Sequence, residues 1–246
     1  MAHGCSGSRD LAPLHGEESN PAFAGGARGS QAMRALRLAA FATLAGAPQG
    51  SGAVVLLLRR LWSSPLPGKV KETFWRLVYD GLPTAVRMRQ NSGCPCGVAE
   101  ADRAHHFWDC AAAQGVRDAI TTAAAAARTP LPPLSRAHVW LSQCPEGLHP
   151  GVWDIVIMVA VAAMDRARRF MVFQHSFAQA PVPRGPELGR RGAERARVSF
   201  WELLHEFAAS GCTPSGVTSG VPLGATHPFL CSTSQGAVRV QVLSTG

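Results

Sequence analysis

Apolar side chains recur at helical spacing in several parts of this 246-residue chain. Within residues 69–81, Val70, Phe74 and Leu77 stand three or four positions apart, which stacks them on one helical face. Residues 194–210 show the same pattern, with polar side chains on the opposite face. The pattern therefore predicts an amphipathic helix in each stretch.

Other segments give a more uniform apolar pattern. Residues 152–173 begin apolar on all sides and end in a run of arginines. A helix that is apolar all round is a buried helix. The remaining predicted elements are a short buried helix or strand over 53–62, a short helix opened by Pro83, a helix over 104–128, and a single strand over 238–243.

Composition divides the chain into four segments. We expect residues 1–52, rich in Gly, Ala and Ser, to be disordered and of low complexity, apart from a short Ala-rich helix over 33–47. A small helical module over 53–128 and a helical extension over 129–180 follow. Residues 181–246 read as a linker, an amphipathic helix and a disordered tail. The predicted fold class is mostly α, with disordered N- and C-terminal ends.

Charge and hydropathy favour a phosphate-bearing partner over a membrane. The chain carries 24 Lys and Arg against 16 Asp and Glu, for a net charge of +8. Such an excess fits contact with phosphates. The longest apolar run, Ile155–Met164, is ten residues long, whereas spanning a membrane takes roughly 20. We therefore expect no membrane partner.

Cysteine and histidine gather in one short stretch. The pattern C-x-C-x8-H-x4-C places Cys94 and Cys96 in a turn and His105 and Cys110 at the start of a predicted helix. Three Cys and one His are a standard ligand set for structural zinc. Gly97 gives the backbone the freedom that a thiolate-binding turn requires. The alternative is that these cysteines are small buried apolar side chains.

The histidine ligand is ambiguous on spacing alone. In a regular helix His106 lies four residues before Cys110 and shares its face, whereas His105 lies five residues away and about 140° round the helix. His105 would turn inward only if the helix began at His106 or later. The residues by themselves leave both histidines open.

The stretch from Leu61 to Cys110 resembles the zinc-binding domain that follows the reverse transcriptase in non-LTR (LINE-type) retrotransposons. The resemblance covers about residues 55–120 and continues weakly into the helix that contains Trp153. The matching elements are Lys69-Val70-Lys71, Phe74-Trp75-Arg76-Leu77, Gly81-Leu82-Pro83-Thr84, Arg87, Cys94-Pro95-Cys96-Gly97, Glu100, His105 and Cys110.

This resemblance implies a function and selects His105 over His106. It implies a zinc-stabilised module that associates with RNA or DNA beside a polymerase. Basic residues could contact phosphates, since Arg and Lys are the usual phosphate ligands. We expect this role for Lys69, Lys71, Arg76, Arg87 and Arg89. Trp62, Trp75 and Trp108 could stack on single-stranded bases, although their helical spacing favours a place in the core.

We expect no enzymatic activity, because the chain lacks polymerase, P-loop, nucleophile-elbow and H-E-x-x-H motifs. Four protein ligands would leave zinc no open position, so the metal would be structural. A second interpretation is a scaffold remnant of a retroelement that docks a protein partner through the 152–173 helix. A third interpretation is that the chain is a decayed retroelement fragment with no selected function. The nucleus or cytoplasm is the favoured compartment.

Overall fold

The computed structural model describes residues 21–48, 52–84, 93–129, 131–212, 229–232 and 238–240. These parts of the chain are mostly α-helical, as predicted. The elements are α1 (Pro21–Ala45), α2 (Ala53–Ser63), α3 (Gly68–Val78), the π-helical turn η1 (His105–Asp109), α4 (Ala111–Ala126), α5 (Arg136–Trp140), α6 (Pro150–Ser176), α7 (Pro186–Ala209), β1 (Leu230–Ser232) and β2 (Val238–Val240).

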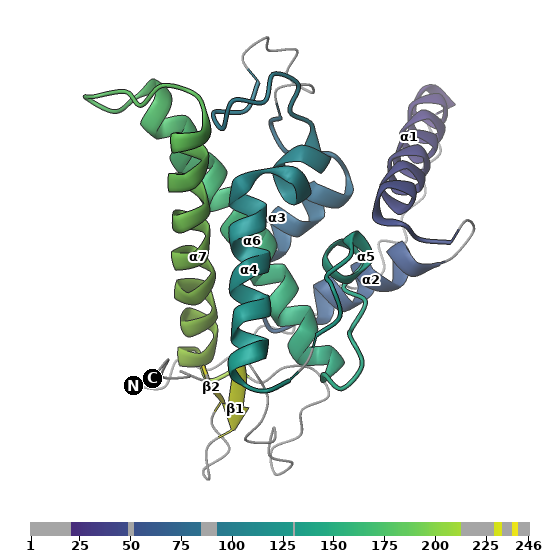
Figure 1. The fold of residues 1–246 in the computed structure, drawn as a ribbon. Coiled ribbons are helices and arrows are strands. Elements are labelled where there is room, and N and C mark those ends of the chain that lie inside the picture. The colour runs from purple at the N-terminus through teal and green to yellow at the C-terminus, as the bar shows by residue number, and fades with distance from the viewer. Residues whose placement is uncertain are drawn as a thin grey trace, which may run out of the picture.

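Three long helices form the centre of the molecule. In Figure 1, α4 and α7 run side by side with α6 behind them. Along α6, nearly every side chain from Val152 to Met164 is buried, as its apolar composition predicts. Glycines allow the backbones to approach closely: a Cβ added at Gly115 of α4 would lie 2.6 Å from the carbonyl oxygen of Ala193 in α7. Apolar burial and small residues thus hold this centre together.

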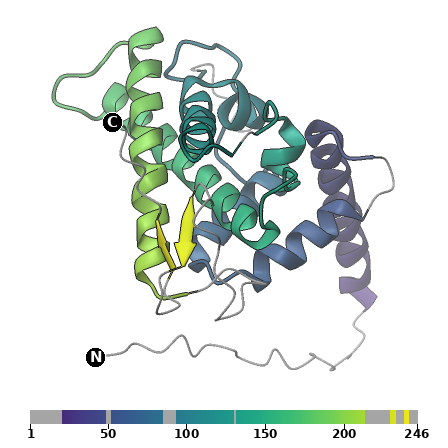
Figure 2. The same ribbon diagram turned by 60° about the horizontal axis from the view of Figure 1, so that its bottom comes forward.

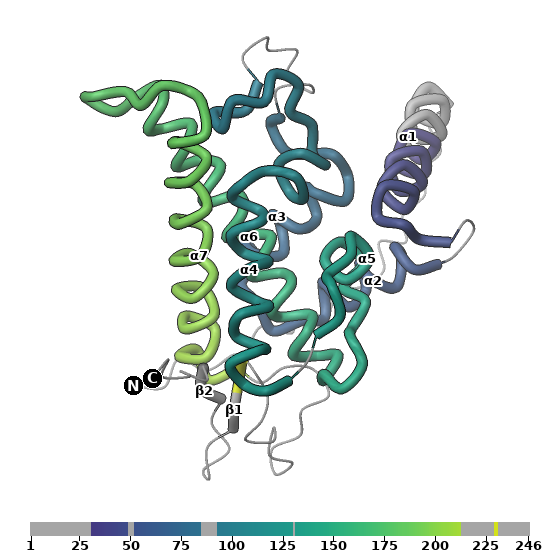
Figure 3. Tube along the Cα trace, viewed as in Figure 1, coloured from purple at the N-terminus to yellow at the C-terminus, as the bar shows by residue number. Residues whose placement is uncertain are grey.

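The N-terminal helices and the two strands lie around this centre. Helix α1 contacts α2, α3 and α5 on one side of the molecule, which Figure 3 shows as the purple and blue trace beside α5. Phe41 of α1 stacks on Trp140 of α5 with ring centroids 5.7 Å apart. The antiparallel strands β1 and β2 pair Leu230 with Val240 beside the end of α7 (Figure 2).

Several predicted elements are confirmed. Residues 53–62 are helical rather than extended, and the Ala-rich helix and the helices predicted over 69–81 and 152–173 are present. The expected strand is present as β2, although it pairs with β1 instead of standing alone. The short helix predicted from Pro83 falls mostly outside the described residues.

Other predictions were wrong in their limits. The disorder expected over 1–52 does not hold for Pro21–Ala45, which is helical. Helix α7 begins at Pro186, eight residues before the predicted start, because proline suits the first helical turn. Asp80, not Gly81, is the left-handed residue that ends α3, with a φ of 52°. Helices α4 and α7, which come from two of the predicted segments, share one core.

No helix in the described parts of the chain combines the length and the apolar character needed to cross a membrane.

Candidate metal centre

A tight turn supplies the first two cysteines of the cluster. The backbone N–H of Cys94 donates to the Val98 carbonyl at 2.7 Å, and that of Gly97 donates to the Cys94 carbonyl at 3.0 Å. Gly93 and Gly97 both have positive φ, at 61° and 108°, which favours glycine at each position. The turn therefore closes between two glycines, and only the second was expected from the sequence.

A π-helical turn supplies the other two residues. The predicted continuous helix over 104–128 was wrong here, because η1 ends at Asp109 and Cys110 is extended, with φ −63° and ψ 145°. The N–H of Cys110 donates to the carbonyl of His105 at 2.7 Å, which is the i to i+5 bond of a π-turn. This wider turn brings His105 and Cys110 to the same side, which a regular α-helix would not do.

The four predicted ligands converge. The ligand atoms of Cys94, Cys96, His105 and Cys110 all lie within 4.8 Å of one another. Cys94 Sγ lies 3.9 Å from Cys110 Sγ, and Cys96 Sγ lies 3.3 Å from His105 Nε2. Cys94, His105 and Cys110 are buried and Cys96 is half-buried. These residues form a candidate metal site.

Hydrogen bonds within the cluster shift the pKa values of Cys94, Cys96 and His105. Hydrogen bonds with Cys110 and Cys94 lower the pKa of Cys96, whereas hydrogen bonds with Cys110 and Cys96 raise the pKa of Cys94. Burial by itself lowers the pKa of His105, but hydrogen bonds with Cys110 and Cys96 outweigh it and raise that pKa to about 10. A metal cation at the cluster would take the place of the protons in these hydrogen bonds.

His106 lies next to the cluster in a different role. Its Nδ1 is 3.9 Å from Cys94 Sγ, and its ring meets that of His105 edge to face. Burial lowers the pKa of His106 to about 4, so the ring is neutral at pH 7. His106 is thus a buried neutral ring packed against the cluster of four.

Two residues that sequence reasoning missed hold η1 in place. Asp102 Oδ1 accepts a hydrogen bond from the backbone N–H of His105 at 2.7 Å, which is the geometry of a helix N-cap. Arg103 is buried and donates to the carbonyls of Leu77 and Val78 at 3.3 and 3.1 Å. Asp102 could have been found from the preference of Asp for the position just before a helix; the role of Arg103 depends on tertiary packing.

The cysteine turn also rests on the corner between α6 and α7, at the top of Figure 3. The N–H of Gly185 donates to the Pro95 carbonyl at 3.0 Å. An added Cβ at Gly97 would lie 3.3 Å from Gly185 Cα, and one at Gly189 would lie 3.3 Å from Cys96 Cβ. The candidate metal site is therefore in direct contact with the first turn of α7.

The three described residues among those predicted to bind nucleic acid have different surroundings. Lys69 lines an open cleft with arginines of α6 and α7. Lys71 donates to the Trp62 carbonyl at 3.1 Å, and Arg76 pairs with Glu72 within the same helix. Arg87 and Arg89 lie outside the described residues.

Two of the tryptophans expected in the core are exposed. Trp62 and Trp75 are 55% and 39% exposed, and the ring of Trp75 lies 4.9 Å from that of Tyr79. Trp108 is half-buried beneath Arg117, whose guanidinium carbon lies 4.1 Å from the ring centroid. The core prediction was wrong for Trp62 and Trp75.

Fold and cluster together define an α-helical protein with a Cys3His candidate metal site. Comparison with protein-family models, with curated proteins and with solved structures finds no match to this chain.

Proposed function

We propose that this chain is a zinc-stabilised helical module that associates with nucleic acid and has no polymerase activity of its own. The observation that carries the zinc part is the geometry of the cluster. Zn–S bonds of about 2.3 Å and Zn–N bonds of about 2.0 Å at tetrahedral angles place two sulfurs about 3.8 Å apart and a sulfur and nitrogen about 3.6 Å apart. The separations of 3.9 and 3.3 Å in the cluster are close to both values.

The composition of the cluster supports zinc in a structural role. Thiolate and imidazole are the ligands that zinc prefers in structural sites, and four of them leave no open position for water or substrate. The buried surroundings of Cys94 and Cys110 fit a closed site of this kind. Convergence of all four ligands also argues against a decayed fragment, in which nothing would keep them together.

Charge and exposed aromatic rings support the nucleic-acid part. The chain has a net charge of +8, and sequence-independent binding to nucleic acid depends mainly on contacts between basic side chains and phosphates. Trp62 and Trp75 are exposed beside Lys71, which binds the Trp62 carbonyl. Exposed aromatic rings beside basic groups are typical of proteins that bind single strands.

The scaffold interpretation receives less support. It required an apolar surface along residues 152–173, but most apolar side chains of α6 are covered by α3, α4 and α7. What remains exposed on that helix lies at its C-terminal end, around Phe173.

Metal analysis followed by binding measurements tests this proposal. Purified full-length protein is expected to contain about one zinc per chain, and a chelator is expected to remove it with loss of part of the helical circular dichroism signal. The zinc-loaded protein is then expected to bind labelled RNA or DNA with an affinity that falls as salt rises. Purified protein that contains no zinc while residues 93–110 stay ordered would contradict the metal assignment, and absence of salt-dependent binding would contradict the nucleic-acid assignment.

A further inference from the structure

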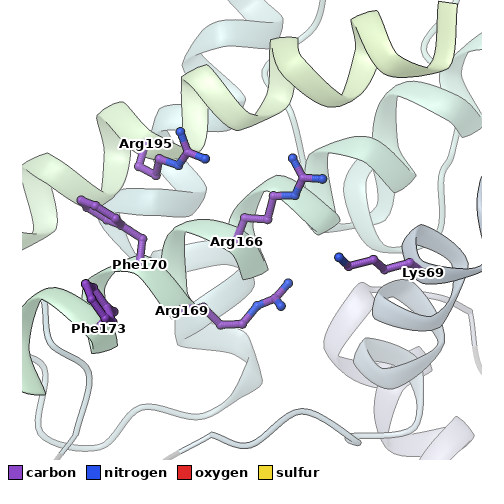
Figure 4. A pocket seen from close by; sticks show the side chains of 6 residues that line it. All are labelled: Lys69, Arg166, Arg169, Phe170, Phe173 and Arg195. Atoms are coloured by element: carbon purple, nitrogen blue, oxygen red, sulfur yellow. The ribbon is translucent and has the colours of Figure 1, made fainter. Parts of the chain in front are cut away.

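An open cleft of about 510 Å³ lies between α3, α6 and α7. Figure 4 shows its lining: Lys69 at one end, Arg166, Arg169 and Arg195 along the middle, and the rings of Phe170 and Phe173 at the other end. The side chains of Lys69 and Arg169 extend toward one another from opposite walls. Four cations and two aromatic rings thus face one concave surface.

The tertiary structure gathers this set from two separate basic stretches. Lys69 comes from the first, between Arg59 and Arg89, and the three arginines come from the second, between Asp165 and Arg197. On α6, Arg166, Arg169, Phe170 and Phe173 stand at helical positions i, i+3, i+4 and i+7, so they share one face. The N-terminal half of α6 is buried, whereas this face of its C-terminal half lines the open cleft.

The exposed carboxylates near the cleft, Glu202 and Glu206, hold Arg166 and Arg195 only weakly. Arg166 lies 3.9 Å from Glu202 and 3.7 Å from Glu206, which exceeds hydrogen-bonding distance. Arg195 donates two long hydrogen bonds to the Glu202 carboxylate, at 3.4 and 3.5 Å. Exposed ion pairs of this kind contribute little to stability, so a phosphate group can displace them. Asp165 is different, because it is buried and binds both Arg168 and Arg169.

The aromatic end of the cleft is accessible to a flat ligand. Phe173 is 53% exposed and Phe170 is half-buried. Phe177, one turn beyond Phe173, is 72% exposed. Large aromatic side chains exposed in a row beside arginines offer stacking surfaces for bases, whereas the bases of a duplex are already stacked on one another.

We propose that this cleft binds single-stranded nucleic acid, with backbone phosphates on Lys69, Arg166, Arg169 and Arg195 and a base stacked on Phe173. The inference rests on the proposed function and assigns its site. It places most of the phosphate contacts on α6 and α7, and of the residues predicted from the sequence to bind nucleic acid it includes Lys69. Binding is sequence-tolerant, because both phosphate contact and ring stacking are available to every base.

Fluorescence anisotropy with labelled oligouridylate, oligothymidylate and a duplex of equal length tests the assignment on the zinc-loaded full chain. The double variant R166Q/R169Q is expected to weaken single-strand binding at least tenfold and to lower the slope of log affinity against log salt by about 1.4, for two lost phosphate contacts. Phe173→Ala is expected to weaken single-strand binding by about tenfold, as for loss of one stacked base, and to leave duplex binding unchanged.

Two further variants make the result independent of folding defects. Arg190→Gln removes an arginine of α7 that is 71% exposed and pairs with Glu187; it does not line the cleft and is expected to bind as wild type does. Glu202→Gln removes the carboxylate that faces both Arg166 and Arg195, and it is expected to strengthen single-strand binding several-fold. A gain in affinity cannot come from misfolding.

The outcomes separate the site from the function. If wild type binds single strands and R166Q/R169Q, Phe173→Ala and Glu202→Gln all bind equally well, the cleft assignment is overturned and the proposed function stands. Loss of binding in a Trp62→Ala/Trp75→Ala variant alone would then move the site to those rings. If the zinc-loaded wild type binds no nucleic acid, both the site and the nucleic-acid function are rejected.

Discussion

The metal cluster region, residues 93–110, and the helical core of α4, α6 and α7 are stabilised in different ways. The core buries a long series of apolar side chains and packs glycine against backbone. The cluster region has few large apolar side chains; Phe107 is the main one that is fully buried. Its remaining support comes from hydrogen bonds of Asp102 and Arg103 and from the four converging Cys and His side chains.

This difference shows that two regions of one chain can be stabilised by different interactions, one by apolar burial and the other by metal coordination. Apolar burial contributes about 25 cal/mol per Å² and needs no ligand, so the core is expected to persist without metal. A short segment of turns cannot bury enough apolar area, so its order depends on the bonds that a metal supplies. The two regions are in contact where Gly97 approaches Gly185 and where Cys96 approaches Gly189. Loss of order in the metal cluster region is therefore expected to increase the mobility of the start of α7.

The largest expected effect comes from Cys110→Ser. It removes one of four ligands from a buried site and is expected to abolish stable zinc binding and to cost several kcal/mol, since small structural zinc sites have apparent binding energies of roughly 10–16 kcal/mol. Hydrogen exchange is expected to rise over residues 93–125, while most of α6 stays protected. Zinc analysis and exchange mass spectrometry measure both effects.

Cys144→Ser is the matched control for that experiment. Cys144 is half-buried, lies outside the cluster and contacts the carbonyl of Leu148 through its thiol. It is expected to keep full zinc content. Full zinc and an unchanged melting temperature in Cys110→Ser would show that the cluster is not the metal site.

The two adjacent histidines provide the next test. His105→Asn is expected to lower zinc affinity by more than the roughly 100-fold that loss of an outer-shell partner can cost, because Nε2 of His105 belongs to the cluster. His106→Asn is expected to keep zinc stoichiometry and to change affinity by less than about tenfold. Competition with a chromogenic chelator measures both. The reverse order would place His106 in the ligand set.

The sequence could predict the ligand types but not the geometry that selects between the histidines. Cysteine spacing and Gly97 identified the turn, and apolar periodicity located α3, α6 and much of α7. Periodicity assumes regular α-helix, so it could not show the π-turn at His105 that brings this ring to the side of Cys110. The cleft of Lys69, Arg166 and Arg195 escaped prediction for a related reason, because its members come from helices that only tertiary packing brings together.

A smaller effect is expected from Arg103→Met, which weakens the link between the cluster region and α3. Methionine retains an apolar side chain but loses the donors to the Leu77 and Val78 carbonyls, which lie at the C-terminal end of α3 and need partners. The expected cost is about 2 kcal/mol, since hydrogen bonds to charged groups contribute roughly 1.5–3 kcal/mol. Urea unfolding of the zinc-loaded protein measures it.

Arg76→Met is the control for the Arg103 variant. Arg76 is exposed, and within the described residues its ion pair is with Glu72, one turn away in α3. Loss of this side chain is expected to lower the free energy of unfolding by less than about 0.5 kcal/mol. Equal stability of the two variants would mean that Arg103 does not join η1 to α3.

The smallest expected effect tests the core alone, through Gly115→Ala in α4. Alanine favours helix over glycine by about 0.8–1 kcal/mol, but the added Cβ would lie 2.6 Å from the Ala193 carbonyl oxygen and 2.9 Å from its Cα. Both are backbone atoms of α7, which cannot turn aside, and overpacking of this kind costs typically 1–3 kcal/mol. The cost of overpacking is expected to exceed the gain in helix propensity, so the free energy of unfolding should fall by about 1 kcal/mol. Urea unfolding measures this loss, and zinc content should be unchanged.

Gly68→Ala completes the comparison, because nothing lies within 4 Å of a Cβ added there at the start of α3. With no contact to oppose it, this variant is expected to be as stable as wild type or more stable by up to about 1 kcal/mol. If Gly115→Ala is stabilised equally, α4 and α7 can separate without loss, and the core does not depend on the close backbone contact that distinguishes it from the metal cluster region. If instead Gly115→Ala loses zinc, the two regions are coupled through α7 and do not have separate stabilities.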